Sequence, residues 1–342
     1  MPEPRFQAPK TRVFELEVLQ GLVPFVLNEI LDLAGAKMIQ KNEESIRFLY
    51  AAKTEKLSHF RKAIAVYLVS QFAIPRPKAL LGNQQFAQLL SAIRWVMAEQ
   101  PFQSFRFEAA GKDSSVFNRL AEELSKALEI PFEPEEGELM LRVRPFPDGW
   151  EVLIRLTPRP LSARPWRVCN MAGGLNASLA AVMNELARPK PHERYLNAMC
   201  GSGTLLIEQA LKSPCKALTG VDIRQEALDC ARKNLNAAAL SKVQLINADI
   251  TKYELEQPFD VITADLPWGD AIGSHKANAE LYPAFLAAVA RGSSHHARLV
   301  ILTHEIKLFE TLLKKDKNWT LKQSIRVSHS GHYPRIYLLH KV

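Results

Sequence analysis

The sequence predicts an α/β protein in which a doubly wound, mostly parallel sheet follows two smaller α+β domains. The main observation is that strand-like apolar runs alternate with amphipathic helical segments beyond residue 175, which is typical of a doubly wound sheet. A second observation is that proline-rich breaks at 74–82 and 158–167 divide the rest of the chain. The third is length, because 342 residues suffice for two or three domains.

Residues 1–73 have the element order of a ferredoxin-like domain. Alternating apolar and polar residues predict a strand over 12–20, and helical spacing predicts a helix over 23–34. The same patterns predict the remaining elements, which are strands at 36–41, 45–51 and 65–72 and a helix at 54–64. The resulting order, β-α-β-β-α-β, is the ferredoxin-like arrangement.

Residues 74–157 form a second predicted unit. The turn Pro147-Asp148-Gly149 between two alternating runs predicts a hairpin. The predicted elements are helices at 83–99 and 114–130 and strands at 102–109, 139–146 and 149–157. The next segment, 158–174, starts with three closely spaced prolines and lacks an apolar period, so we expect a linker there.

Residues 175–342 carry the alternating pattern of the doubly wound sheet. Strands are predicted at 194–199, 216–223, 242–250, 259–267 and 297–304. Helices are predicted at 175–187, 203–212, 225–238 and 281–292. In such a sheet, ligands bind outside the carboxyl ends of the strands, so we look for functional residues there.

Composition indicates an ordinary globular protein. Hydrophobic residues make up 47% and charged residues 23% of the chain, which excludes a largely disordered or collagen-like protein. No apolar run approaches the ~18 residues of a membrane span, and the first residues lack the apolar core of a signal peptide, so no membrane partner is expected. The four cysteines are widely spaced and form no C-x-x-C motif. This spacing predicts a reduced, cytoplasmic protein without a disulfide framework or zinc cluster.

The net charge of +8 suggests a polyanionic partner. Basic residues concentrate in one segment, 151–169, which holds a single acid, Glu151, and four arginines: Arg155, Arg159, Arg164 and Arg167. A local concentration of this kind fits phosphate contacts better than a uniformly basic surface does. Solvated surface charge is the alternative for most individual lysines.

We predict no metal-binding or catalytic role for two groups of reactive side chains. The pairs His295-His296 and His329/His332 lack a third ligand at suitable spacing, so surface or turn positions are expected rather than a metal site. Cys200 has no base nearby in the sequence. It is therefore predicted to be a small packed residue rather than a nucleophile.

The segment Asn197–Thr204 joins a predicted strand to a helix through a glycine turn. Gly201 and Gly203 allow the backbone to approach a ligand where a Cβ would clash. The segment lacks the lysine pattern of a P-loop, and Leu206 stands where a dinucleotide-binding motif has its third glycine. A ligand site of another kind and a tight βα turn both remain compatible with this segment.

Acidic residues end the next two predicted strands. Asp222 lies 19 residues after Gly203, where an acid can accept hydrogen bonds from a ribose; the alternative is an N-cap for the helix at 225–238. Asp249 ends the following strand. There it can accept a hydrogen bond from an adenine amino group while Ile250 covers a ring face, and the alternative is a surface turn.

An acid, a proline and an aromatic residue leave the fourth strand together at Asp265-Leu266-Pro267-Trp268-Gly269. Pro267 fixes its own φ and thereby aims the preceding carbonyl groups. Asp265 and the Leu266 carbonyl can accept hydrogen bonds from a planar amino group whose ring stacks on Trp268, which requires a nucleobase removed from its stack. The alternative is a proline-stabilised turn with Trp268 covering the core.

These four segments, in this order and spacing, resemble the class I S-adenosylmethionine-dependent methyltransferases that methylate amino groups. That family's last motif reads [ND]-P-P-[YFW], and Leu266 replaces its first proline here. The form D-L-P-[YFW]-G is similar to one in tRNA guanine-N2 methyltransferases, and residues 105–128 and 149–167 resemble their THUMP domain. The resemblance implies a ferredoxin-like domain (1–73), a THUMP RNA-binding domain (74–157), a linker (158–174) and a Rossmann-like class I methyltransferase domain (175–342).

The resemblance also implies roles for individual residues. Asn197 stands where the family usually has an acid that faces the cofactor's ammonium group, so an acceptor remains but a charge is lost. Catalytic roles fall on Asp265, Leu266, Pro267 and Trp268. Cofactor-binding roles fall on Asn176, Ser178, Asn197, Ala198, Cys200, Gly201, Ser202, Gly203, Thr204, Asp222, Ile223, Ala248, Asp249, Ile250 and Asp265.

The implied function is methyl transfer from S-adenosylmethionine to the exocyclic N2 of a guanosine in tRNA, at position 6 of the acceptor stem. Position 10 of tRNA and ribosomal RNA are alternatives with the same chemistry. The THUMP-like half argues against DNA adenine-N6 methylation, and only Asn197 supports a non-catalytic RNA-binding scaffold. The implied partner is tRNA, held at its acceptor stem and 3′ end. Its backbone would meet Arg155, Arg159, Arg164 and Arg167, with no metal and with the protein as a monomer.

Overall fold

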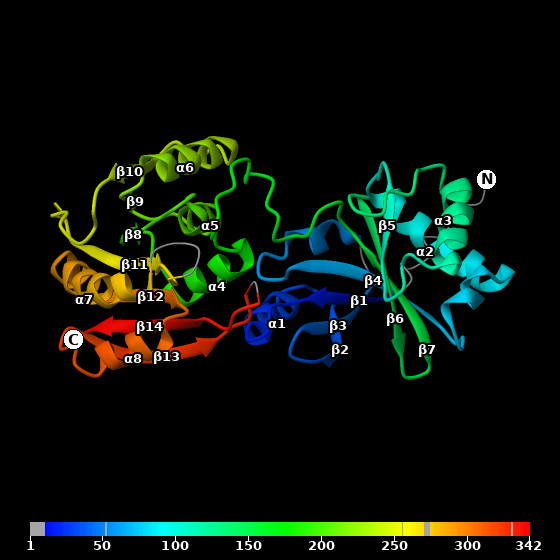
Figure 1. The fold of residues 1–342 in the computed structure, drawn as a ribbon, viewed down its shortest axis with the longest axis horizontal. Helices are drawn as coiled ribbons and strands as arrows, with labels where there is room; N and C mark the ends of the chain where they lie inside the picture. Colours follow the sequence, from blue (N-terminus) through cyan, green and yellow to red (C-terminus); the bar gives the residue numbers. More distant parts are fainter. Residues whose placement is uncertain (1–10, 52, 255, 270–273, 330) are drawn as a thin grey trace, which may run out of the picture. The chain divides into compact units, whose positions relative to one another are not determined.

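The computed structural model describes residues 11–51, 53–254, 256–269, 274–329 and 331–342. The chain forms two compact units (Figure 1). The amino-terminal unit extends to Ser162, and the carboxyl-terminal unit starts at Ala163 and also includes Leu19–Leu22. The division after Ser162 lies inside the segment 158–174 that the sequence predicts as a linker. No helix in the described ranges has the length and apolar character needed to cross a membrane.

The first part of the amino-terminal unit has the predicted ferredoxin-like pairing. Its elements are β1 (Arg12–Glu17), α1 (Val23–Leu31), β2 (Lys37–Lys41), β3 (Ser45–Tyr50), η1 (Thr54–His59) and β4 (Ala65–Phe72). β1 lies antiparallel to both β3 and β4, and β2 lies antiparallel to β3. The predicted helix at 54–64 is a short 3₁₀ helix instead, because the Glu29 carboxylate accepts the backbone N–H groups of Arg61 and Lys62 and draws the chain away from a helical path.

The second part adds three strands to the same sheet. Its elements are η2 (Pro77–Leu81), α2 (Asn83–Glu99), β5 (Phe105–Glu108), α3 (Ser115–Leu128), β6 (Leu139–Phe146) and β7 (Gly149–Arg155). β7 pairs antiparallel with β4 from Tyr67↔Arg155 to Phe72↔Trp150, so one seven-stranded sheet in the order β2-β3-β1-β4-β7-β6-β5 crosses the expected boundary at 73/74. The predicted ferredoxin-like and THUMP segments therefore share one sheet, and the boundary between them stays a prediction.

The carboxyl-terminal unit is the predicted doubly wound structure. Its elements are α4 (Ala177–Ala187), β8 (Arg194–Ala198), α5 (Thr204–Lys212), β9 (Ala217–Asp222), α6 (Gln225–Ala237), β10 (Val243–Asn247), β11 (Phe259–Asp265), α7 (His275–Arg291), β12 (Ser293–Thr303), α8 (Ile306–Leu313), β13 (Trp319–Arg326) and β14 (Arg335–Lys341). The strand order is β10-β9-β8-β11-β12-β14-β13. The first five are parallel, and β14 is antiparallel to both of its neighbours.

The order of the strands reverses between β8 and β11. From β8 the chain winds outward through β9 and β10, and it then returns to β11 and winds the other way through β12. The core of this unit lies beside these central strands, where Leu196, Ile262 and Leu299 are completely buried together with Tyr282 and Phe285 of α7. The reversal creates a switch point, and a crevice at the carboxyl ends of β8 and β11 is the expected ligand site.

Candidate active site

The four predicted segments follow β8, β9, β10 and β11, and they meet at one cavity of about 720 Å³. Gly201, Asp222, Asp249, Asp265 and Trp268 all line it. The parallel pairing explains this convergence, because parallel strands place their carboxyl ends at the same edge of the sheet. The glycine turn and the turn after Asp265 thus border the same cavity.

The glycine turn presents bare backbone to the cavity. Gly201 has a φ of +53°, and a Cβ built on it would meet no atom within 4 Å, so its open side faces the cavity that it lines. Gly203, with a φ of +81°, does not line the cavity. It packs instead against α6, where a Cβ would lie 3.2 Å from the Cβ of Ala231. The two glycines therefore differ in their surroundings, because Gly201 is open and lines the cavity whereas Gly203 is packed against α6.

Asp222 ties the glycine turn to the end of β9. One carboxylate oxygen accepts the Gly201 N–H at 2.8 Å, and the other accepts the Arg224 N–H at 3.0 Å. The alternative role as an N-cap of α6 does not hold, because Arg224 occupies that position and no side chain caps it. Each carboxylate oxygen has a further lone pair, so Asp222 can still accept hydrogen bonds from a ligand.

Asp249 and its neighbours form the adjacent wall. The Asp249 carboxylate accepts hydrogen bonds from the Thr251 hydroxyl at 2.7 Å and the Thr251 N–H at 3.0 Å, which lowers its pKa. Ile250 is buried below it, whereas Ile223 lines the cavity although 65% of its surface is exposed. An apolar side chain left open at a cavity rim is suited to cover the face of a flat ring.

Asp265 ends β11 at the wall of the cavity and is half-buried. Burial raises the pKa of its carboxyl group to about 7, although the Trp268 indole N–H donates to it at 3.2 Å. Pro267 is fixed beside it, because its carbonyl accepts hydrogen bonds from the Tyr282 hydroxyl at 2.7 Å and the Asn278 amide at 2.9 Å. The turn is thus held in one conformation, and Trp268 borders the cavity rather than covering the core.

Asn197 contributes an unpaired acceptor. Its side chain is 1% exposed, and its amide nitrogen donates to the Thr263 carbonyl at 3.2 Å. Its Oδ1 is buried and has no hydrogen-bond partner among the residues that the structure describes, although Asn197 lines the cavity. A buried acceptor without a donor costs roughly 1–3 kcal/mol, so this atom is suited to a ligand that carries an N–H group.

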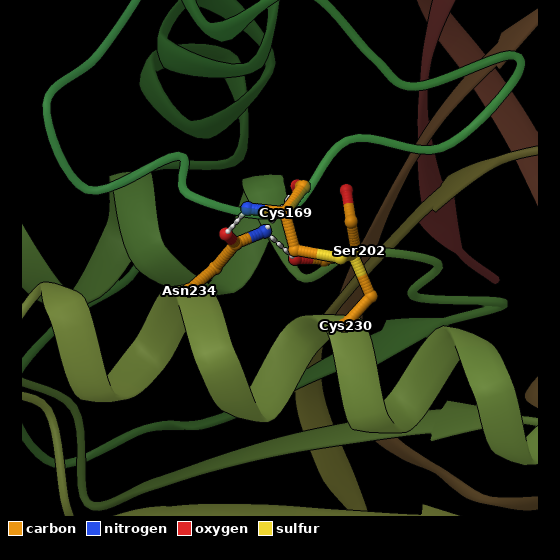
Figure 2. The surroundings of a disulfide bond; sticks show 4 residues. All are labelled: Cys169, Ser202, Cys230 and Asn234. Carbon is orange, nitrogen blue, oxygen red and sulfur yellow. Dashed lines mark hydrogen bonds between the residues drawn. A yellow bond between two sulfur atoms is a disulfide. The ribbon is translucent and has the colours of Figure 1, made fainter.

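A further wall comes from Met171–Leu175, which the sequence prediction missed. A disulfide between Cys169 and Cys230 joins this segment to α6, and Asn234 fixes it next to the bond (Figure 2). The Asn234 side chain accepts from the Cys169 N–H at 2.8 Å and donates to the carbonyls of Cys169 and Ser202. The expectation of a reduced protein without disulfides was wrong on this pair, because 61 residues separate two cysteines that only the fold brings together.

Several predicted cofactor residues do not line the cavity. Asn176 caps α4 by accepting the N–H groups of Ser178 and Leu179, and Ser178 is completely buried. Ala198 lies inside the core, and Gly203 packs as described above. The other predicted cofactor-binding residues line it: Asn197, Cys200, Gly201, Ser202, Thr204, Asp222, Ile223, Ala248, Asp249, Ile250 and Asp265.

Three of the four predicted RNA-binding arginines have structural roles. Arg155 is 1% exposed and donates to the carbonyls of Glu138, Thr157 and Pro158. Arg164 is buried against the Glu208 carboxylate at 2.8 Å. Arg167 donates to the Leu175 carbonyl and the Thr204 hydroxyl and so braces the cavity wall. Only Arg159 of the four is exposed.

The remaining reactive side chains are partly as predicted. Burial raises the pKa of Cys200, so its thiol stays protonated and does not act as a nucleophile. His329 and His332 line the cavity beside Trp268, a position that the sequence did not reveal. No group of three metal-binding side chains occurs in the part of the chain that the structure describes.

A family model described as an RMKL-like methyltransferase domain matches residues 164–335. The chain belongs to this family. It is 27% identical over 293 residues to the tRNA (guanine(6)-N2)-methyltransferase of Thermus thermophilus, covering 82% of this chain and 86% of that one. It is 29% identical over 254 residues to the protein of that name in Methanocaldococcus jannaschii, covering 63% of this chain and 66% of that one. The chain spans 36% of the human relative THUMP3, to which it is 31% identical over 182 residues.

The fold agrees with that membership. The crystal structure of TrmN from Thermus thermophilus superposes with a TM-score of 0.79 at 24% identity, covering 97% of this chain and all of that one. The likeness shows that the chain shares the fold of that protein, and the cofactor that the sequence predicts for it is S-adenosylmethionine. The cavity has features that suit this cofactor: Gly201 leaves room for it, Asp222 ends β9, Asp249 follows β10, and the buried Asn197 Oδ1 has no hydrogen-bond donor among the described residues.

Proposed function

We propose that this protein transfers a methyl group from S-adenosylmethionine to the exocyclic N2 of guanosine 6 in the acceptor stem of tRNA. The observation that carries the proposal is that Asp265 and Trp268 border the same cavity as the glycine turn at Gly201. The names of the relatives in Thermus thermophilus and Methanocaldococcus jannaschii support both the base and the position.

The cofactor would lie along the ends of β8, β9 and β10. The second lone pairs of Asp222 would accept hydrogen bonds from the ribose hydroxyls, and Asp249 would accept one from the adenine amino group. Ile223 and Ile250 would cover the two sides of the adenine ring. The free Oδ1 of Asn197 would receive the ammonium group of the methionine part.

S-adenosylmethionine supplies an electrophilic methyl group on a sulfonium. The chain's own contribution is to prepare the amino group, whose lone pair is delocalised into the guanine ring and is a poor nucleophile. Hydrogen bonds accepted by the Asp265 carboxylate and the Leu266 carbonyl would orient the N–H bonds and direct the lone pair toward the methyl carbon. Positive charge that develops on the nitrogen would be stabilised by Asp265. With a pKa of about 7, the carboxylate can also take up the proton that the nitrogen then releases.

The partner in this proposal is tRNA, bound by its acceptor stem and 3′ end to the amino-terminal unit, with the protein acting as a cytoplasmic monomer without a metal. Arg159 remains a candidate backbone contact because it is exposed. The buried Arg155 and Arg164 do not, because their guanidinium groups are occupied inside the fold.

The test is incubation with methyl-labelled S-adenosylmethionine and unmodified tRNA, followed by nucleoside mapping with mass spectrometry. The expected product is N2-methylguanosine at position 6. A matched tRNA with inosine at that position lacks the N2 amino group and should accept no label. Label at another nucleotide, label in the inosine control, or no transfer at all would overturn the proposal.

A further inference from the structure

Two histidines border the cavity without a part in the chemistry proposed above. His329 and His332 follow β13 and face each other in a backbone bridge, in which each N–H donates to the other's carbonyl at 2.9 Å. Gly331 between them has a φ of +79°, a conformation that favours glycine in so tight a bridge. The bridge thus fixes the backbone positions from which both imidazole side chains extend.

Both imidazoles pack against Trp268. The ring centroids of His329 and His332 lie 5.9 Å from that of Trp268, at interplanar angles of 83° and 73°. The Trp268 indole in turn donates to the Asp265 carboxylate at 3.2 Å. Asp265, Trp268 and the two histidines therefore form a chain of contacts, and all four residues line the cavity.

The chemistry of these four residues matches one edge of guanine. Next to the exocyclic amino group, the base presents the N1–H donor, and then the O6 acceptor. A neutral imidazole offers one donor and one acceptor. Burial and the neighbouring His332 lower the pKa of His329, which keeps this imidazole neutral near pH 7. With the amino group at Asp265, the N1–H and O6 groups would extend toward the histidines.

We propose that His329 and His332 determine the specificity for guanine by hydrogen-bonding its N1–H and O6 groups. The inference rests on the proposed function, because it assumes that Asp265 receives the N2 amino group. A base that has this amino group but lacks N1–H and O6 should bind without forming hydrogen bonds to the two imidazoles. Sites built to hydrogen-bond a substrate discriminate strongly against such analogues.

The test compares guanosine with 2-aminopurine at position 6 of the tRNA, since 2-aminopurine has the amino group but neither N1–H nor O6. The wild-type protein should prefer guanosine by at least tenfold in kcat/KM. The double variant His329→Ala/His332→Ala should lose activity on guanosine and retain it on 2-aminopurine, so that the preference falls toward one. His332→Gln, which keeps a donor and an acceptor, should restore part of the preference.

His304 provides a matched control. Its ring centroid lies 5.8 Å from Trp268 and 4.9 Å from His332, but it does not line the cavity. His304→Ala should slow both substrates equally if it changes activity at all. An unchanged dissociation constant for S-adenosylmethionine would show that each variant is folded.

Equal losses on both substrates in the double variant would overturn the specificity role and leave the histidines as supports for Trp268. A failure of the proposed function looks different, because the wild-type protein would then methylate neither substrate.

Discussion

Asp265 joins two properties in a single side chain: burial raises its pKa to about 7, and it borders the same cavity as the glycine turn. Asp265→Asn removes the carboxylate and keeps the shape. We expect kcat to fall by about 10²–10³-fold, the range seen when one stabilising group is lost from a preorganised site. Single-turnover methyl transfer to tRNA measures this loss.

The control for this substitution lies on the same strand. Asp260 is at the other end of β11, where it accepts hydrogen bonds from the Arg194 N–H and the Ser294 hydroxyl, and it does not line the cavity. Asp260→Asn should leave kcat nearly unchanged. Calorimetry should show that Asp265→Asn still binds S-adenosylmethionine within about tenfold of the wild-type affinity. Full turnover of Asp265→Asn would disprove its proposed role.

The raised pKa of Asp265 also sets the sign of a pH dependence. Only the ionised carboxylate can stabilise the developing positive charge and take up the proton, so kcat/KM should rise with pH up to about 7 and fall about tenfold for each pH unit below it. The free energy of unfolding has the opposite dependence on pH. The unfolded carboxyl ionises near its ordinary pKa of 3.8 and the folded one near 7, so stability falls as pH rises between these values. Asp265→Asn should therefore unfold at a higher temperature than wild type at pH 8. A flat rate profile would contradict this assignment.

At the residue scale, the sequence predicted the site because acidic residues stand at the ends of predicted strands. Asp222 and Asp265 are the last residues of β9 and β11, Asp249 follows β10 by two residues, and a doubly wound order brings these strand ends together. His329 and His332 were missed because they belong to a bridge between β13 and β14, whose approach to Trp268 depends on the pairing of β14 with β12. No spacing in the sequence encodes that contact.

The segment before α4 is the element whose position depends most on cross-links. Met171–Leu175 lines the cavity, and the Cys169–Cys230 disulfide and Asn234 hold its start against α6. Cys230→Ser, or reduction of the wild type, should release this wall and weaken S-adenosylmethionine binding. It should also lower the free energy of unfolding by about 4 kcal/mol, the chain-entropy value for a loop of this length.

Calorimetric titration and thermal unfolding, with and without reductant, test this prediction. Cys215→Ser is the matched control, since Cys215 is a free cysteine away from the cavity. Cytoplasmic disulfides are uncommon and often respond to redox conditions, so the comparison bears on the proposed location as well. Equal cofactor affinity and melting temperature in Cys230→Ser and wild type would show that the bond does not support the wall.

Burial alone did not decide which strands were predictable, because β10 was predicted without a buried residue whereas β14 was missed although Ile336 and Leu339 are completely buried. β8, β9, β11 and β12 match predicted segments because their buried residues form continuous runs. β13 was missed because its residues from Thr320 to Ser324, all of them exposed, carry no regular alternation of apolar and polar side chains. α7 starts at His275 rather than at 281, because the Ser274 hydroxyl accepts the Ala277 N–H and caps the helix there.

At the scale of the whole molecule, the sequence predicted the doubly wound sheet but not the continuity of the amino-terminal one. The pairing of β4 with β7 joins segments about 80 residues apart, as in Gln71↔Glu151, and only tertiary packing decides it. The proposed function depends on the carboxyl-terminal unit, because one cavity there must serve both the methyl donor and the base that accepts the methyl group.

A crystal structure of the protein with S-adenosylhomocysteine tests this requirement most directly. The ammonium group of the ligand should contact Oδ1 of Asn197, its ribose should lie at Asp222, and its sulfur should point toward Asp265 and the Leu266 carbonyl. A ligand bound outside the cavity, or one whose sulfur faces away from Asp265, would contradict the proposed mechanism.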